Sequence, residues 1–157
     1  MVHVAATGRD TGVDGASPAR LYATLVGAVV VAAGIIGFFY EASFDTATGN
    51  NIPSDDVFGI LAVNGWHNVV HILLGLLGLA AAGSTSAART YCLGVGALYV
   101  VLAIWGFLEA ENGFGVLIDL VPVNTEDNFL HLILGVTGIG AGLATPSAKS
   151  PSPARAG

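Results

Sequence analysis

The sequence contains four long stretches without a charged residue, and the first of them, Leu21–Tyr40, continues for twenty residues. A helix rises about 1.5 Å per residue, so about 20 residues cross the roughly 30 Å hydrocarbon core of a bilayer. Because lipid offers no partner to a bare backbone N–H or C=O group, a stretch that spans must be helical. The predicted spans are about 21–40, 61–82, 90–108 and 128–145, within a membrane domain of residues 20–145.

The predicted fold class is therefore all-α, a four-helix transmembrane bundle. Of the 157 residues, 54% are hydrophobic and only 10% are charged, whereas soluble domains carry roughly 25% charged residues. The lipid bilayer is thus the predicted partner. The net charge of −6 argues against a nucleic-acid partner, which would need clustered Lys and Arg. The single cysteine, Cys92, excludes an intrachain disulfide and is predicted to be a buried, inert thiol.

The charges predict the orientation of the spans. All basic residues precede the first span, join the second to the third, or follow the fourth: Arg9, Arg20, Arg89, Lys149 and Arg155. The other two loops hold nine carboxylates and no base. The positive-inside rule then places both termini in the cytoplasm, in a multi-pass plasma-membrane protein. Residues 1–19 and 146–157, rich in Gly, Ala, Ser and Pro, are predicted to be disordered cytoplasmic tails.

The membrane domain contains an internal repeat. Residues 63–78 read V-N-G-W-H-N-V-V-H-I-L-L-G-L-L-G, and residues 123–138 read V-N-T-E-D-N-F-L-H-L-I-L-G-V-T-G. The shared pattern is V-N-x-x-[HD]-N-x-x-H-x-x-L-G-x-x-G. Since both copies would start on the cytoplasmic side, the pattern predicts two parallel helix–loop–helix repeats about an axis normal to the membrane.

Helical spacing places a row of polar residues, followed by a row of small residues, on one face of each copy. The polar part is predicted to fasten the second span to the fourth, and the first asparagine of each copy is predicted to be an N-cap. The small part predicts that these two spans approach each other closely, flanked by the first and third. The polar seam is Asn64, Asn68, His71, Asn124, Asn128 and His131. The packing seam is Gly75, Gly78, Ala82, Gly135, Gly138 and Gly142.

These motifs carry a resemblance to a known family. With H-N-V-V-H-I-L-L-G at 67–75 and V-N-T-E-D-N-F-L-H-L-I-L-G at 123–135, the chain resembles domain-of-unknown-function family 4383. The resemblance covers about residues 20–145 and implies a four-helix bacterial membrane protein, mainly of actinobacteria. It implies no activity, so no catalytic residue is transferred from it.

The first functional hypothesis is a structural or accessory membrane subunit of unknown activity. Interhelical hydrogen bonds from buried Asn and His contribute about 0.6 kcal/mol each on average, which suits a fastening role. The sequence holds no nucleophile–base pair, phosphate loop or nucleotide fingerprint, so we do not expect an enzyme. A homo-oligomer or a larger membrane complex is a possible assembly.

Two alternatives make use of the histidines. His71 and His131, at matching depth on two spans, could ligate haem or a metal ion in a redox subunit. For a metal, the candidate ligands are His67, His71, Asp127 and His131. The glycines argue against haem, which needs helices held apart. The second alternative is a small transporter or proton relay, because ionisable groups within a membrane often serve one.

Overall fold

The computed structural model describes residues 17–147, so most of both predicted tails lies outside the described residues. Within this range the chain is mainly helical. Four helices are present, α1 (Pro18–Gly37), α2 (Gly65–Ala81), α3 (Thr85–Glu109) and α4 (Thr125–Ala144). Helix α1 begins two residues inside the range predicted as the N-terminal tail.

Three helices of the described chain, α1, α3 and α4, are long and apolar enough to cross a membrane. Helix α2 has 17 residues and is shorter than the predicted second span. The reason is that Leu61–Val63 forms a strand, so the helix begins only at Gly65. Helix α3, in contrast, begins at Thr85 and extends the predicted third span by one turn on its N-terminal side.

Side chains at the helix starts explain where the helices begin. The Oδ1 atoms of Asn64 and Asn124 accept hydrogen bonds from the backbone N–H groups of His67 and Asp127, which confirms both predicted N-caps. Asp127 completes a capping box with Asn124. Ser17 and Ser84 cap α1 and α3 in the same way.

Two β-hairpins correct the all-α prediction. In the first loop β1 (Asp55–Val57) pairs with β2 (Leu61–Val63), and in the second β3 (Phe114–Leu117) pairs with β4 (Val121–Asn124). The apolar segment 116–121 forms the turn end of the second hairpin. Its Val116 and Leu117 are buried, so the apolar residues serve this hairpin.

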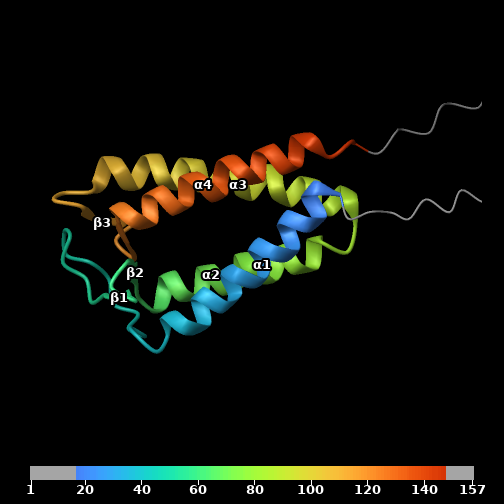
Figure 1. Ribbon diagram of the computed structural model, residues 1–157. Helices are drawn as coiled ribbons and strands as arrows, with labels where there is room; N and C mark the ends of the chain where they lie inside the picture. The colour runs from blue at the N-terminus through green and yellow to red at the C-terminus, as the bar shows by residue number, and fades with distance from the viewer. Residues whose placement is uncertain (1–16, 148–157) are drawn as a thin grey trace, which may run out of the picture.

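Glycines determine which helices pack closely. Helix α1 lies along α2 and α3 lies along α4, as Figure 1 shows. A Cβ atom on Gly75 would come within 2.6 Å of the Gly27 carbonyl oxygen, and one on Gly135 within 2.8 Å of the Gly96 carbonyl oxygen. The prediction that the packing seam joins the second and fourth spans is therefore wrong. Gly75 packs on α1 and Gly135 packs on α3, in each case the other helix of its own pair.

The rest of the packing seam contacts other side chains. Gly78 lies against Tyr91, Gly138 against Tyr22 and Gly142 against Leu93. Ala82 is the C-cap of α2, and its carbonyl oxygen accepts a hydrogen bond from Nε of Arg20.

The two helix pairs meet at the end of the molecule where α1 begins and α4 ends (Figure 1). Ala19, Ala23 and Ala88 are fully buried there, together with Cys92, which confirms the predicted burial of the thiol. Both hairpins lie at the opposite end. Side chains between the two helix pairs near that end form the candidate site.

Candidate functional site

Three histidines meet between the two helix pairs, next to the hairpins. His67 and His71 lie one turn apart on α2, and His131 comes from α4. Each offers a ring nitrogen, and these three atoms all lie within 4.8 Å of one another. The ring centroids are 4.4 Å apart for His67–His71, 6.1 Å for His67–His131 and 6.3 Å for His71–His131. The structure thus brings three of the four candidate metal ligands, His67, His71 and His131, into one cluster.

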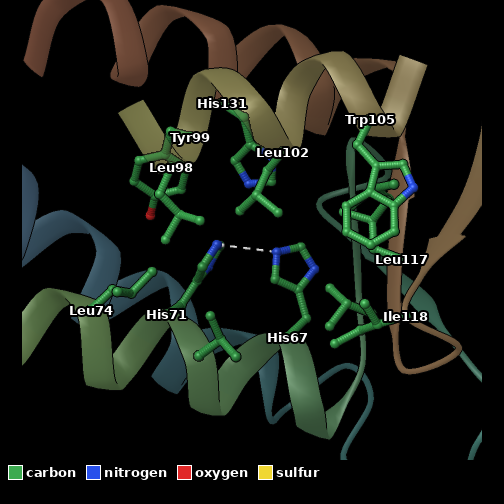
Figure 2. A pocket seen from close by; sticks show the side chains of 13 residues that line it. His67, His71, Leu74, Leu98, Tyr99, Leu102, Trp105, Leu117, Ile118 and His131 are labelled. Atoms are coloured by element: carbon green, nitrogen blue, oxygen red, sulfur yellow. Dashed lines mark hydrogen bonds between the residues drawn. The ribbon is translucent and has the colours of Figure 1, made fainter. Parts of the chain in front are cut away.

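The hydrogen bonds of His67 determine which of its nitrogens is free. Its Nδ1 lies 2.8 Å from the carbonyl oxygen of Ala62, which can only accept, so Nδ1 carries a proton. In the neutral ring Nε2 then presents a lone pair, and it points to Nε2 of His71 at 3.1 Å (Figure 2). Metal-binding histidines commonly donate their other N–H to a backbone carbonyl in this way.

Asp127 supports this arrangement from behind. Its Oδ2 atom accepts hydrogen bonds from the backbone N–H groups of Ala62, at 2.9 Å, and Asn124, at 3.0 Å. Asp127 thereby fixes the backbone at Ala62. The carbonyl oxygen of the same residue accepts the hydrogen bond from Nδ1–H of His67. Asp127, predicted as a metal ligand, is not among the clustered groups found in residues 17–147. Its place in the structure is that of a cap and a support for β2.

A mostly apolar cavity of about 220 Å³ adjoins the three rings. Tyr99 of α3 stacks on His131, with ring centroids 5.1 Å apart and an interplanar angle of 27°. Sequence reasoning missed Tyr99, although it is the one Tyr in the middle of the third span. Figure 2 shows the labelled side chains around the rings. The aliphatic and indole walls are Val70, Leu74, Leu98, Leu102, Trp105, Leu117, Ile118, Val121 and Val123.

Two polar atoms in this region have no hydrogen-bond partner within residues 17–147. They are Nδ1 of His131 and the hydroxyl oxygen of Tyr99, and both residues are at least 96% buried. A buried polar atom without a partner is costly, by about 1–3 kcal/mol. The unused nitrogen of His131 is therefore an atom for which a ligand would provide the missing interaction.

Comparison with known families decides the affiliation of the chain. Residues 20–144 match the family described as Domain of unknown function (DUF4383). The chain belongs to this family. None of the curated proteins and none of the solved structures matches it. Because the DUF4383 description assigns no activity, the chemistry of the site has to be argued from its own residues.

The asparagines of this DUF4383 chain fasten its two loops to each other. The Nδ2 atom of Asn64 donates to the carbonyl of Leu120 at 2.8 Å, and that of Asn124 donates to the carbonyl of Ile60 at 2.7 Å. Each asparagine therefore caps its own helix and holds the opposite hairpin. Asn64 and Asn124 of the polar seam thus join the two halves at this end.

Asn68 and Asn128 instead pack on the helix that precedes their own. A Cβ atom on Gly37 would overlap the Asn68 amide, and one on Gly106 would overlap the Asn128 amide. Asn68 Nδ2 donates to the carbonyl of Glu41 at 2.9 Å. The predicted contact between these two asparagines is therefore absent from residues 17–147, because each side chain packs against the other helix of its own pair.

Substitutions of Asn64 in the DUF4383 chain separate its two tasks. We expect Asn64→Ser to keep the N-cap and lose the bond to Leu120, at a cost of about 1 kcal/mol. Asn64→Ala removes both interactions and should cost about 2 kcal/mol. Thermal unfolding in detergent, followed by circular dichroism, measures the difference. Equal losses for the two variants would contradict the double role.

Proposed function

We propose that this DUF4383 protein is a small membrane subunit that holds a transition-metal ion on His67, His71 and His131. The observation that carries the proposal is the convergence of three ring nitrogens to within 4.8 Å, on two buried histidines and the partly buried His71. Metal–nitrogen bonds of about 2.0–2.1 Å set the ligand nitrogens roughly 3–4 Å apart, so small ring rotations suffice. Imidazole is a suitable ligand for zinc, copper, iron and nickel.

The position of His67 favours a metal ion over haem. In a haem protein with two axial histidines, the macrocycle fills the plane between the two rings. Here the His67 ring centroid lies only 4.4 Å from that of His71 and 6.1 Å from that of His131. A porphyrin between His71 and His131 would have to displace it. We therefore expect no Soret band from protein produced with a full supply of haem.

The membrane part of the proposal is four spans with both termini in the cytoplasm. Helix α2 would cover roughly 26 Å at 1.5 Å per residue, and it packs along α1, which is long enough to cross. Arg20 lies in the first turn of α1 and Arg89 lies near the start of α3. Both helices begin at the end opposite the hairpins (Figure 1), which supports the orientation through the positive-inside rule.

Matching contacts support the two parallel repeats. Gly27 faces Gly75 as Gly96 faces Gly135. The hydroxyl of Tyr22 donates to the Leu134 carbonyl at 2.6 Å, and that of Tyr91 donates to the Leu74 carbonyl at 3.1 Å. Each tyrosine thus reaches from one half to the other. Such reciprocal pairs are the expected result of a two-fold axis between the halves.

Labelling of single cysteines tests the orientation. In a Cys92→Ala background, a cysteine replacing exposed Asp56 in the first hairpin should react with a membrane-impermeant maleimide in intact cells. A cysteine replacing exposed Ser86, at the start of α3, should react only after the cells are opened. The reverse pattern would overturn the proposed topology.

Metal analysis tests the site itself. Protein purified without a polyhistidine tag and loaded with Co²⁺ should bind one equivalent and develop visible ligand-field absorption. The triple variant His67→Ala, His71→Ala, His131→Ala should bind none. His3→Ala, which removes the remaining histidine of the chain, is the matched control and should bind like the wild type. Equal binding by the triple variant and the wild type would sink the proposal.

A structural or accessory role without metal is the second candidate. The observation that favours it is that Asn64 and Asn124 are used fully in caps and in bonds between the hairpins. In that case the triple histidine variant would keep the partners that co-purify with the wild type in mild detergent, and neither protein would hold metal.

A further inference from the structure

The donor atoms of the histidine cluster are uncharged. Neutral imidazole nitrogens provide all three, and no carboxylate or thiolate of residues 17–147 belongs to the group. Cys92 does not contribute a ligand atom, because its Sγ atom contacts the carbonyl oxygen of Ala19 near the start of α1. A bound ion would therefore keep its full formal charge at the site.

The surroundings give this charge little help. The cavity beside the rings has almost wholly apolar walls, formed by residues such as Leu74, Leu98, Leu102 and Leu117. The cost of moving an ion from water into such a medium is several kcal/mol and rises steeply with its charge. Among residues 17–147 only one acidic side chain is buried, that of Asp127. It lies behind His67, joined to it through Ala62, and when ionised it supplies one negative charge, enough to balance a monovalent ion.

The fourth coordination position would face this cavity. A zinc ion on three histidines normally keeps a water molecule there. An ordered water needs about two to four polar partners, and the cavity walls offer few. A monovalent ion that is stable with three ligands does not need this water. The cavity volume of about 220 Å³ leaves space for a small neutral molecule.

These three observations point to one ion. We infer that the site takes copper as Cu⁺, held three-coordinate by His67, His71 and His131, with its open position facing the apolar cavity. The inference rests on the proposed metal binding and adds the identity and charge state of the metal. Binding requires the neutral His71 ring to carry its proton on Nδ1 instead of Nε2, because the Nε2 lone pair must face the ion together with Nε2 of His67.

Competition between Cu⁺ and Zn²⁺ tests the inference. Detergent-solubilised full-length protein is titrated anaerobically with Cu⁺ against a chromophoric Cu⁺ chelator, and separately with Zn²⁺ against a zinc chelator. We expect one Cu⁺ per chain and a Kd for Zn²⁺ that is higher by at least about 100-fold, because uncharged ligands and apolar walls penalise the divalent ion more. Tighter binding of Zn²⁺ would overturn the inference and leave the proposed metal site intact. Binding of neither ion would overturn both.

Two further measurements remain informative if a variant fails to fold. X-ray absorption of the loaded wild-type protein should give a Cu⁺ edge and about three nitrogen neighbours, whereas four neighbours would contradict the open position. Carbon monoxide should add an infrared C–O band that shifts when ¹³CO is used. Monodisperse His67→Gln, His71→Gln and His131→Gln variants should each lose more than the roughly 10–100-fold in affinity that outer-shell changes cause.

Discussion

Gly135→Leu is expected to separate α3 from α4 and to destabilise the protein by about 3 kcal/mol or more. A Cβ atom at this position would lie 2.8 Å from the Gly96 carbonyl oxygen and 2.8 Å from the Val100 backbone nitrogen. Both contacts involve backbone, which a change of rotamer cannot relieve. The helices must therefore move apart, which loses the close packing that holds membrane helices together. The midpoint of thermal unfolding in detergent and the monodisperse fraction after gel filtration measure the effect.

Gly140→Leu provides the matched control in the same helix. Gly140 is exposed, and a Cβ atom there would meet nothing within 4 Å. Leucine is also the better helix former, so this variant should be as stable as the wild type or slightly more so. Gly75→Leu should repeat the loss seen at Gly135, because its Cβ would lie 2.6 Å from the Gly27 carbonyl oxygen. Similar unfolding midpoints for Gly135→Leu and Gly140→Leu would refute the close contact.

The glycine contacts also explain one success and one failure of the sequence analysis. Spacing along a helix identified Gly75 and Gly135 as parts of a close-packed face. It could not identify the partner helix, because a stripe of small residues predicts a close neighbour without naming it. The partners, Gly27 and Gly96, belong to apolar runs in which small residues are frequent, so no pattern distinguished them.

The two β-hairpins could not be predicted from the sequence, for a different reason. Strand pairing depends on contacts between segments and on turn geometry, which the apolar composition of a segment such as 116–121 does not reveal. The turns also place Phe58 and Ile118 in the left-handed region of backbone space, with φ of 55° and 49°. A large aromatic residue and a β-branched residue are uncommon in this region, so the residue types at these positions did not indicate a turn.

The histidines of the candidate site could be predicted from the sequence, whereas Tyr99 and the arrangement of the site could not. His71 and His131 followed from the repeated motif, and His67 and Asp127 followed from the variable position in the same motif. The structure gives this last pair different tasks: the His67 ring enters the cluster, and the Asp127 carboxylate holds Ala62 behind it. This contact joins residues far apart in the sequence, so only the folded chain could reveal it.

Asp127 stabilises the fold at the start of α4 and at β2. Asp127 is 98% buried, and its Oδ2 atom is the acceptor for two backbone N–H groups. Hydrogen bonds to a charged acceptor contribute about 1.5–3 kcal/mol each. One carboxylate thereby fixes both the start of α4 and the strand β2, and through Ala62 it fixes the ring of His67.

Asp127→Ala is accordingly expected to act on stability and on metal binding at once. The N–H groups of Ala62 and Asn124 lose their acceptor, which should cost about 3 kcal/mol of unfolding free energy. The Ala62 carbonyl then no longer orients His67, and metal affinity should fall roughly 10–100-fold, as for other outer-shell partners. Thermal unfolding of the metal-free protein and titration with Co²⁺ below the unfolding midpoint give the two values separately.

Glu126→Gln is the control for this last prediction, since Glu126 is the exposed neighbour in the first turn of α4. It should change stability by less than about 1 kcal/mol through the helix dipole and leave metal affinity unaltered. Asp127→Asn retains one oxygen acceptor without the charge, so both of its values should lie between those of the wild type and Asp127→Ala. A variant at Asp127 that loses stability and keeps full metal affinity would confine this carboxylate to its capping role and remove it from the organisation of the histidine site.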